Sequence, residues 1–156
     1  ALAGVPAIYY NSFLATPNFH AGVAETKRNR TINRRKWTKA EVDARLDDRA
    51  HPAHRMLSRL SEMVKVRRRE PAFDPFAAQQ CLNIDARVFV VRRTDQTQKS
   101  QVLCVFNLSN KSVRVERSSL ALVQSEAYTD LLSGISYSGG QKTLTLAPYQ
   151  SVWIPH

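Results

Sequence analysis

Six short β-rich runs fill the second half of the sequence, and they constrain the fold more than any other feature. They begin after Asp85 and are separated by turn-forming residues at 95–99, 109–111 and 138–141. The runs cover residues 87–93, 101–108, 112–117, 127–131, 142–146 and 151–154. Short strands at this spacing are typical of antiparallel sandwiches. We therefore expect this half to fold as an antiparallel sandwich of the Greek-key type.

Two helices are predicted ahead of the β-rich half. Thr38 and Glu41 have the spacing of a capping box, which predicts a helix from about residue 39 to 48. Pro52 suits the first position of a second helix, and this helix should end before Pro71, because the residue preceding a proline avoids helical geometry. The apolar residues of the second helix share one stripe, which is made of Met56, Leu57, Leu60, Met63 and Val64.

A continuous apolar run occupies residues 4–10, opened by glycine and proline and followed by polar residues. A continuous rather than alternating run is typical of a strand buried on both faces, as in a parallel sheet or the wall of an α/β barrel. Barrel enzymes build their sites just beyond the carboxyl ends of such strands. Because alternate residues of a strand face opposite sides, at most one of Tyr9 and Tyr10 should face a site.

A strongly basic run follows at residues 28–37, where five cations and two amides surround one isoleucine and Trp37 ends the run. No period of 2 or 3.6 places its apolar residues on one face, so the pattern indicates a loop. Arginine binds carboxylate, phosphate or vicinal hydroxyls with a planar fork, and asparagine offers a sugar hydroxyl both a donor and an acceptor. Taken alone, such a run is read most simply as a solvated loop, but the apolar run upstream favours a binding loop.

Together these motifs resemble a known enzyme family. Gly-Val-Pro-Ala-Ile-Tyr-Tyr at 4–10 and Asn-Arg-Thr-Ile-Asn-Arg-Arg at 29–35 resemble the last barrel strand and its loop in the α-amylase family of glycoside hydrolases, in the branch of sucrose phosphorylase. Residues 123–154 resemble the closing β-domain of that family. The resemblance implies an α+β fragment. Residues 1–72 would supply the last β/α unit of a TIM barrel, with its strand, substrate loop and helices, and residues 73–156 would form the antiparallel β-sandwich.

The resemblance also implies an activity and its residues. It implies retaining glucosyl transfer from sucrose or a phosphorylated sucrose to inorganic phosphate. Arg34 would hydrogen-bond the glucosyl unit in the donor site, while Asn33 and Arg30, with the segment 11–20, would border the acceptor site. The catalytic Asp and Glu residues of the family lie on earlier barrel strands, so we expect a longer parent enzyme and no activity from this chain by itself. Departures from the family pattern at 19–20 and 27–29 leave the acceptor open.

Composition supports a globular chain without membrane or metal sites. Apolar residues make up 43% and charged residues 23%, and no stretch approaches the roughly 20 apolar residues of a membrane span. Cys81 and Cys104 have neither disulfide nor metal spacing, so we expect buried, reduced thiols in a cytoplasmic protein. His51 and His54 have no Cys or carboxylate at ligand spacing, and we predict neither a metal nor a cofactor.

Two other functions stay open. A formal net charge of +10 is typical of nucleic-acid-binding proteins, although the arginines are dispersed rather than gathered in a stripe. A non-catalytic carbohydrate-binding or structural β-module is the other alternative, and it requires exposed aromatic residues.

The partners we expect are a sugar and inorganic phosphate, with no membrane. The run 4–10 has no neighbouring strand in this chain, so we also expect it to be disordered or to pair with another copy.

Overall fold

The computed structural model describes residues 1–156 as two compact units. Unit 1 consists of Ala1–Val5 with Lys65–His156, and unit 2 consists of Pro6–Val64. The division of the sequence at residue 72 stays a prediction.

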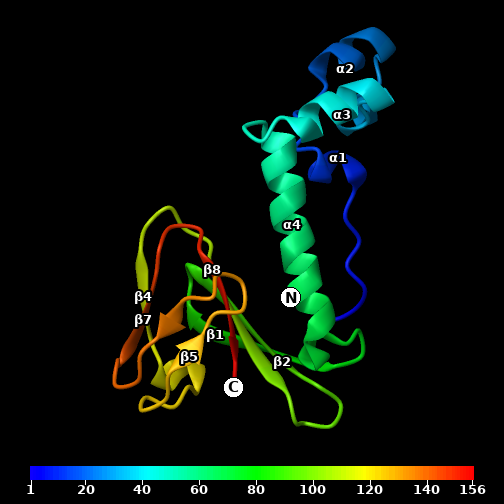
Figure 1. Cartoon of the computed structure of the whole chain (residues 1–156). Coiled ribbons are helices and arrows are strands. Elements are labelled where there is room, and N and C mark those ends of the chain that lie inside the picture. The colour runs from blue at the N-terminus through cyan, green and yellow to red at the C-terminus, as the bar shows by residue number, and fades with distance from the viewer. The chain divides into compact units, whose positions relative to one another are not determined.

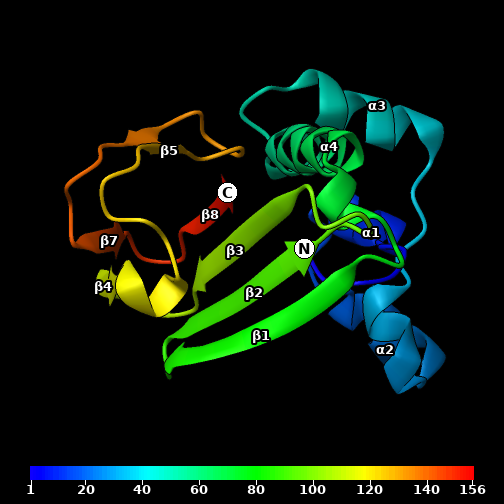
Figure 2. The ribbon, with the colours of Figure 1, turned by 90° about the horizontal axis from the view of Figure 1, so that it is seen from below.

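Unit 1 holds all the strands, and every ladder is antiparallel. The largest sheet has the order β1 (Ala78–Asp85), β2 (Val88–Thr94), β3 (Gln101–Asn107) and β8 (Ser151–Pro155), which Figure 2 shows side by side. Two smaller ladders join β4 (Val113–Glu116) to β7 (Thr143–Leu146) and β5 (Tyr128–Thr129) to β6 (Ser136–Tyr137). A short 3-10 helix, η3 (Ser118–Leu120), follows β4. All six predicted runs contain strands, whereas β1 and β6 were not expected.

One face of the large sheet packs on the β4–β7 ladder and forms the main core. Both β4 and β7 bury alternate residues, which means that each presents one apolar face to the sheet. The core cluster is Val88, Val90, Leu103, Val105, Val113, Val115, Leu120, Leu122, Tyr128, Leu144, Leu146, Val152 and Ile154. The antiparallel sandwich predicted from the sequence is therefore confirmed.

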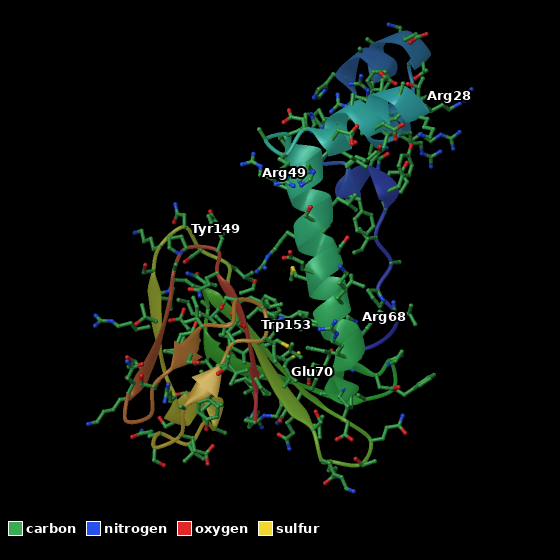
Figure 3. All side chains as sticks on the ribbon, viewed as in Figure 1. Arg28, Arg49, Arg68, Glu70, Tyr149 and Trp153 are labelled. Carbon is green, nitrogen blue, oxygen red and sulfur yellow. The ribbon has the colours of Figure 1, made fainter.

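The opposite face of the same sheet is also buried. Val91, Cys104 and Trp153 lie opposite one another in register on β2, β3 and β8, and all three are inaccessible to solvent. The Trp153 ring packs 4.7 Å from the ring of Phe73, in the 3-10 helix η2 (Pro71–Phe73), and Figure 3 labels Trp153 together with Glu70, which precedes η2. Burial raises the pKa of the Cys104 thiol to about 12. Cys81 ends the same row on the edge strand β1 and is exposed, so the expectation that both thiols are buried is wrong for Cys81.

The fully buried guanidinium of Arg93 lies at this second face. It donates only to backbone carbonyls: Nη1 to Ala1 at 2.9 Å, Nη2 to Asp74 at 2.8 Å and Ala77 at 3.2 Å, and Nε to Ala78 at 3.3 Å. Burial, and then the charge of a neighbouring arginine, lowers the pKa of Arg93 from its ordinary value. One side chain thus fixes the first residue of the chain and the segment that enters β1.

Unit 2 is helical. It contains α1 (Tyr10–Phe13), α2 (His20–Thr26), the 3-10 helix η1 (Asn29–Asn33), α3 (Lys39–Asp47) and the start of α4 (Pro52–Arg69), labelled in Figure 1 except for η1. The two predicted helices and the capping box are confirmed, since the Glu41 amide donates to Thr38 Oγ1 and the Thr38 amide donates to the Glu41 carboxylate. The helices α1, α2 and η1 lie within the expected loop and are too short to show a period. No helix of the chain combines the length and the apolarity that crossing a bilayer requires.

The strand expected at residues 4–10 does not form. These residues pair with no strand, Tyr10 already belongs to α1, and Val5 is 80% exposed. Gly4 donates to the carbonyl of Pro75, yet the amides of Val5, Ala7, Ile8 and Tyr9 donate to nothing. A strand buried on both faces needs two neighbours, and every strand of this structure belongs to the antiparallel ladders of unit 1. Pairing of this segment with a second copy stays a prediction.

We predict that hydrogen exchange divides the chain accordingly. The amides of Val5, Ala7, Ile8 and Tyr9 should exchange rapidly in a dilute monomer, because they lack acceptors, while those of Val90 and Val105 should be among the slowest. Exchange measured by NMR checks this. Slow exchange at Val5 to Tyr9 in a demonstrably monomeric sample would show that the segment has found a partner within the chain.

We predict that Arg93→Leu destabilises unit 1 by about 3 kcal/mol or more, because it leaves several buried carbonyls without donors. Urea unfolding followed through Trp153, which lies in unit 1, measures the change. Arg114→Leu, at an exposed position on β4, is the matched control and should change stability little. Equal stability of the two variants would contradict the role assigned to Arg93.

Candidate substrate-binding loop

An open hollow in unit 2 brings the three predicted site residues together. It has a volume of about 550 Å³. Its lining consists of Tyr9, Tyr10, Arg30, Ile32, Asn33, Arg34 and Lys36. Arg30 and Asn33 belong to η1, and Arg34 is the residue that ends it. The sequence prediction that Arg30, Asn33 and Arg34 bind substrate is not tested by this arrangement, but the fold places all three where one small ligand could contact them.

The hollow is cationic and its cations have no protein partners. The side chains of Arg30, Arg34 and Lys36 are exposed and form no hydrogen bond or ion pair. No carboxylate is among the lining residues. Arg28, by contrast, lies at the surface of unit 2 outside the lining (Figure 3). Unpaired guanidinium and ammonium groups around one hollow suit an oxyanion or a polyhydroxylated ligand.

Two adjacent tyrosines, Tyr9 and Tyr10, also line the hollow. Their ring centroids lie 4.8 Å apart at an angle of 64°. Both tyrosines line the hollow, and the strand alternation behind the expectation that at most one faces a site does not apply, because α1 begins at Tyr10. The Tyr10 hydroxyl donates to the carbonyl of Arg35 at 2.8 Å. Loss of hydration, and then the neighbouring Tyr9 phenol, raises the pKa of Tyr10.

The loop ends in a stack of cations on Trp37. The guanidinium of Arg35 lies 3.9 Å from the Trp37 ring centroid and 5.6 Å from that of Phe19, and Arg45 of α3 lies 4.0 Å from the Trp37 centroid. Two guanidinium groups at such distances must occupy opposite faces of the indole. Each contact of this kind contributes about 0.5–1 kcal/mol at an exposed site. Trp37 is therefore a packing anchor, as predicted, and Arg35 is held away from the hollow.

Sequence reasoning missed one residue that lines the hollow. Lys36 lines the hollow, although only its membership of the basic run could have singled it out. Asn11, expected at the border of the acceptor site with the rest of segment 11–20, is instead 5% exposed and buried behind the loop. A polar residue directly after an apolar run was the available signal. The histidines lie elsewhere: His51 Nδ1 accepts from the Ala53 amide, and His54 Nδ1 lies 2.6 Å from the Leu46 carbonyl.

Comparison with known proteins gives consistent matches along the chain. The family model described as "Amylosucrase, C-terminal domain" matches residues 79–155. The chain is 33% identical over 155 residues to a glucosylglycerate phosphorylase of Allomeiothermus silvanus, a match that covers 99% of this chain and 25% of the relative. A glucosylglycerate phosphorylase of Spirochaeta thermophila is 31% identical over 162 residues, covering 99% of this chain and 28% of the relative. The chain thus spans about a quarter of the length of the curated relatives it matches.

Solved structures agree on the fold. An Anoxybacillus α-amylase superposes with a TM-score of 0.56 at 14% identity, covering 80% of this chain and 25% of that chain. At this identity the likeness concerns the fold alone. The comparisons therefore agree with the motifs: residues 79–155 match a C-terminal domain of the amylosucrase type, the whole chain is similar to glucosylglycerate phosphorylases, and its fold is like that of an α-amylase.

Proposed function

We propose that this chain is part of a phosphorylase that transfers a glucosyl unit between an α-glucoside and inorganic phosphate. The observation that carries the proposal is the 30–33% identity to three glucosylglycerate phosphorylases over 97–99% of the chain. The cationic hollow supports it, since phosphate and glycerate are both oxyanions. The glucosyl donor we propose is therefore an α-glucoside of a small carboxylate-bearing acid such as glycerate, with sucrose and phosphorylated sucrose as the alternatives.

In this proposal the chain binds and orients substrate but does not supply the reacting carboxylates. Retaining transfer needs two carboxyl groups about 5–5.5 Å apart, and no carboxylate lines the hollow. In the retaining reaction one carboxylate would bond to the glucosyl carbon as the glycosidic bond breaks, while the other carboxyl group would protonate the leaving oxygen. A phosphate oxygen would then displace the carboxylate from the glucosyl carbon and return a proton to the second group. Arg34 would donate to hydroxyls of the glucosyl unit, while Arg30, Asn33 and Lys36 would face the acceptor or the phosphate.

The test is a chimera in which this chain replaces the matching quarter of the Allomeiothermus silvanus enzyme. We predict that the chimera releases glucose 1-phosphate from glucosylglycerate and phosphate, and that Arg34→Ala lowers kcat/KM by roughly 100-fold, because it removes preorganised donors from the bound sugar. Arg28→Ala is the matched control, since Arg28 belongs to the same basic run but lies outside the hollow, and it should leave kcat/KM nearly unchanged.

The 156-residue chain by itself serves as the negative control and should show no turnover. Turnover that survives removal of contaminating enzymes would contradict the absence of reacting carboxylates. A folded chimera without phosphorolysis of glucosylglycerate, sucrose or phosphorylated sucrose would overturn the proposed function.

A sugar-binding surface on unit 1 is the second candidate, and the exposed aromatic ring of Phe76 favours it. Phe76 is 86% exposed and borders an open hollow of about 580 Å³. Gln98 and Gln101 line the same hollow, and their amide groups form no hydrogen bonds within the protein. An aromatic face beside free amides suits a neutral sugar, because the ring packs on C–H groups and each amide both donates and accepts.

For this candidate we predict that maltohexaose shifts the NMR signals of Phe76 and Gln98 in the 156-residue chain, and that Phe76→Ala abolishes the shifts. Tyr149→Ala is the control, because Tyr149 is another exposed aromatic residue of unit 1 and does not line this hollow. Absence of shifts with maltohexaose and with cellohexaose would dismiss the second candidate.

A further inference from the structure

We propose that Asn11 is a positioning residue that sets the direction in which Arg34 enters the hollow. This inference rests on the proposed function, because it assigns a role in the same site. Asn11 itself does not line the hollow and is buried behind the loop. Its effect on a ligand must therefore pass through the backbone that carries Arg34.

The Asn11 amide uses all of its main hydrogen-bonding positions. Its Nδ2 donates to the carbonyls of Asn33 at 3.2 Å and Arg35 at 3.1 Å. Its Oδ1 accepts from Trp37 Nε1 at 3.0 Å and from Thr16 Oγ1 at 3.1 Å. A primary amide has two donors and an oxygen with two lone pairs, so four partners satisfy it completely.

The two donated bonds bracket Arg34 in the chain. One carbonyl belongs to the residue before Arg34 and the other to the residue after it, which restrains the peptide groups on both sides of the Arg34 Cα. The Arg34 amide is held as well, since it donates to the carbonyl of Thr31 at 3.0 Å. Tyr10 adds a second donor to the Arg35 carbonyl. The Arg34 side chain, in contrast, has no protein partner, so its starting direction depends on this backbone.

No other side chain of similar size supplies the same pattern. Aspartate would keep the acceptors for Trp37 and Thr16 but would set a carboxylate against two carbonyl oxygens. Leucine would fill the volume and leave both carbonyls and the indole N–H without partners, which is costly for buried groups. In a loop with five cations and no glycine, this amide joins the backbone on both sides of Arg34 to the end of the apolar run.

Misplacing a substrate-binding group by about 1 Å can cost up to 100-fold in rate, because the bound geometry must match the transition state. In the chimera, Asn11→Leu should therefore lower kcat/KM by about 10-fold or more. The decisive measurement is the double variant Asn11→Leu/Arg34→Ala. If Asn11 acts through Arg34, the leucine substitution should cost little in the background that already lacks Arg34.

Thr38→Ala is the matched structural control. It removes the capping box of α3, which lies outside the loop, and should destabilise the protein without changing kcat/KM at temperatures where the enzyme is folded. Additive losses from Asn11→Leu and Arg34→Ala would overturn the inference and leave the proposed function standing. An active chimera that is insensitive to Arg34→Ala would also overturn it, whereas an inactive folded chimera would overturn the proposed function first.

A measurement on the 156-residue chain does not depend on activity. The Trp37 indole N–H has acceptors in Asn11 and Thr16, so it should exchange slowly, and Asn11→Leu should speed its exchange at least about 10-fold. Trp37→Phe assigns the indole signal. Unchanged exchange of the Trp37 indole in the leucine variant would show that Asn11 does not hold the loop.

Discussion

A buried positive charge without a carboxylate organises the β-rich part of this protein. Taking a guanidinium out of water is expensive, and Arg93 recovers that cost from backbone carbonyls instead of an ion pair. Backbone carbonyl oxygens are free to accept such bonds where the chain is not paired within a strand ladder. The Arg93 guanidinium therefore lies next to irregular segments. The entry to β1 and the first residue of the chain are both fixed in this way. Arg67 likewise donates to backbone carbonyls, those of Leu2 and Gly4.

The two units rely on different forces. In unit 1 a cluster of valines, leucines and isoleucines is inaccessible to solvent on one side of the sheet, and a second apolar row covers the other side. In unit 2 the buried residues are few, namely Asn11, Leu14, Gly22 and Ala53, so hydrophobic burial contributes little there. Its loop depends on one amide, one indole and two stacked guanidinium groups. Polar contacts are directional, which suits a segment whose task in our proposal is to aim side chains at a ligand.

Apolar periodicity and helix caps predicted the regular helices and strands. The helices at Lys39–Asp47 and Pro52–Arg69 and the strands around Val90 and Val105 follow apolar patterns or caps that sequence displays directly. The apolar run at residues 4–10 has the composition of a buried strand but forms none, in line with the expectation that it has no neighbouring strand in this chain. Loop geometry was the other gap: nothing in the sequence shows that Arg35 stacks on Trp37 while Arg34 stays free, or that Asn11 faces the loop and not the hollow. The contacts of Asn11 join residues 22 and 24 positions apart, and the stacking of Arg35 depends on the shape of the loop, so only the folded backbone settles these choices.

The order of the units along the chain determines how unit 2 is connected to unit 1. Unit 2 leaves unit 1 after Val5 and rejoins it at Lys65, so it is an insertion and not a sequential neighbour. The hydrogen bonds from Arg67 to Leu2 and Gly4 join the segment that leaves unit 1 to the segment that returns to it. The base of unit 2 is thus closed by hydrogen bonds inside unit 1, while α4 runs on without a break across the boundary between Val64 and Lys65. A segment exchanged between relatives would therefore keep an anchored base if it carried α4 whole, together with the partners of Arg67 at Leu2 and Gly4.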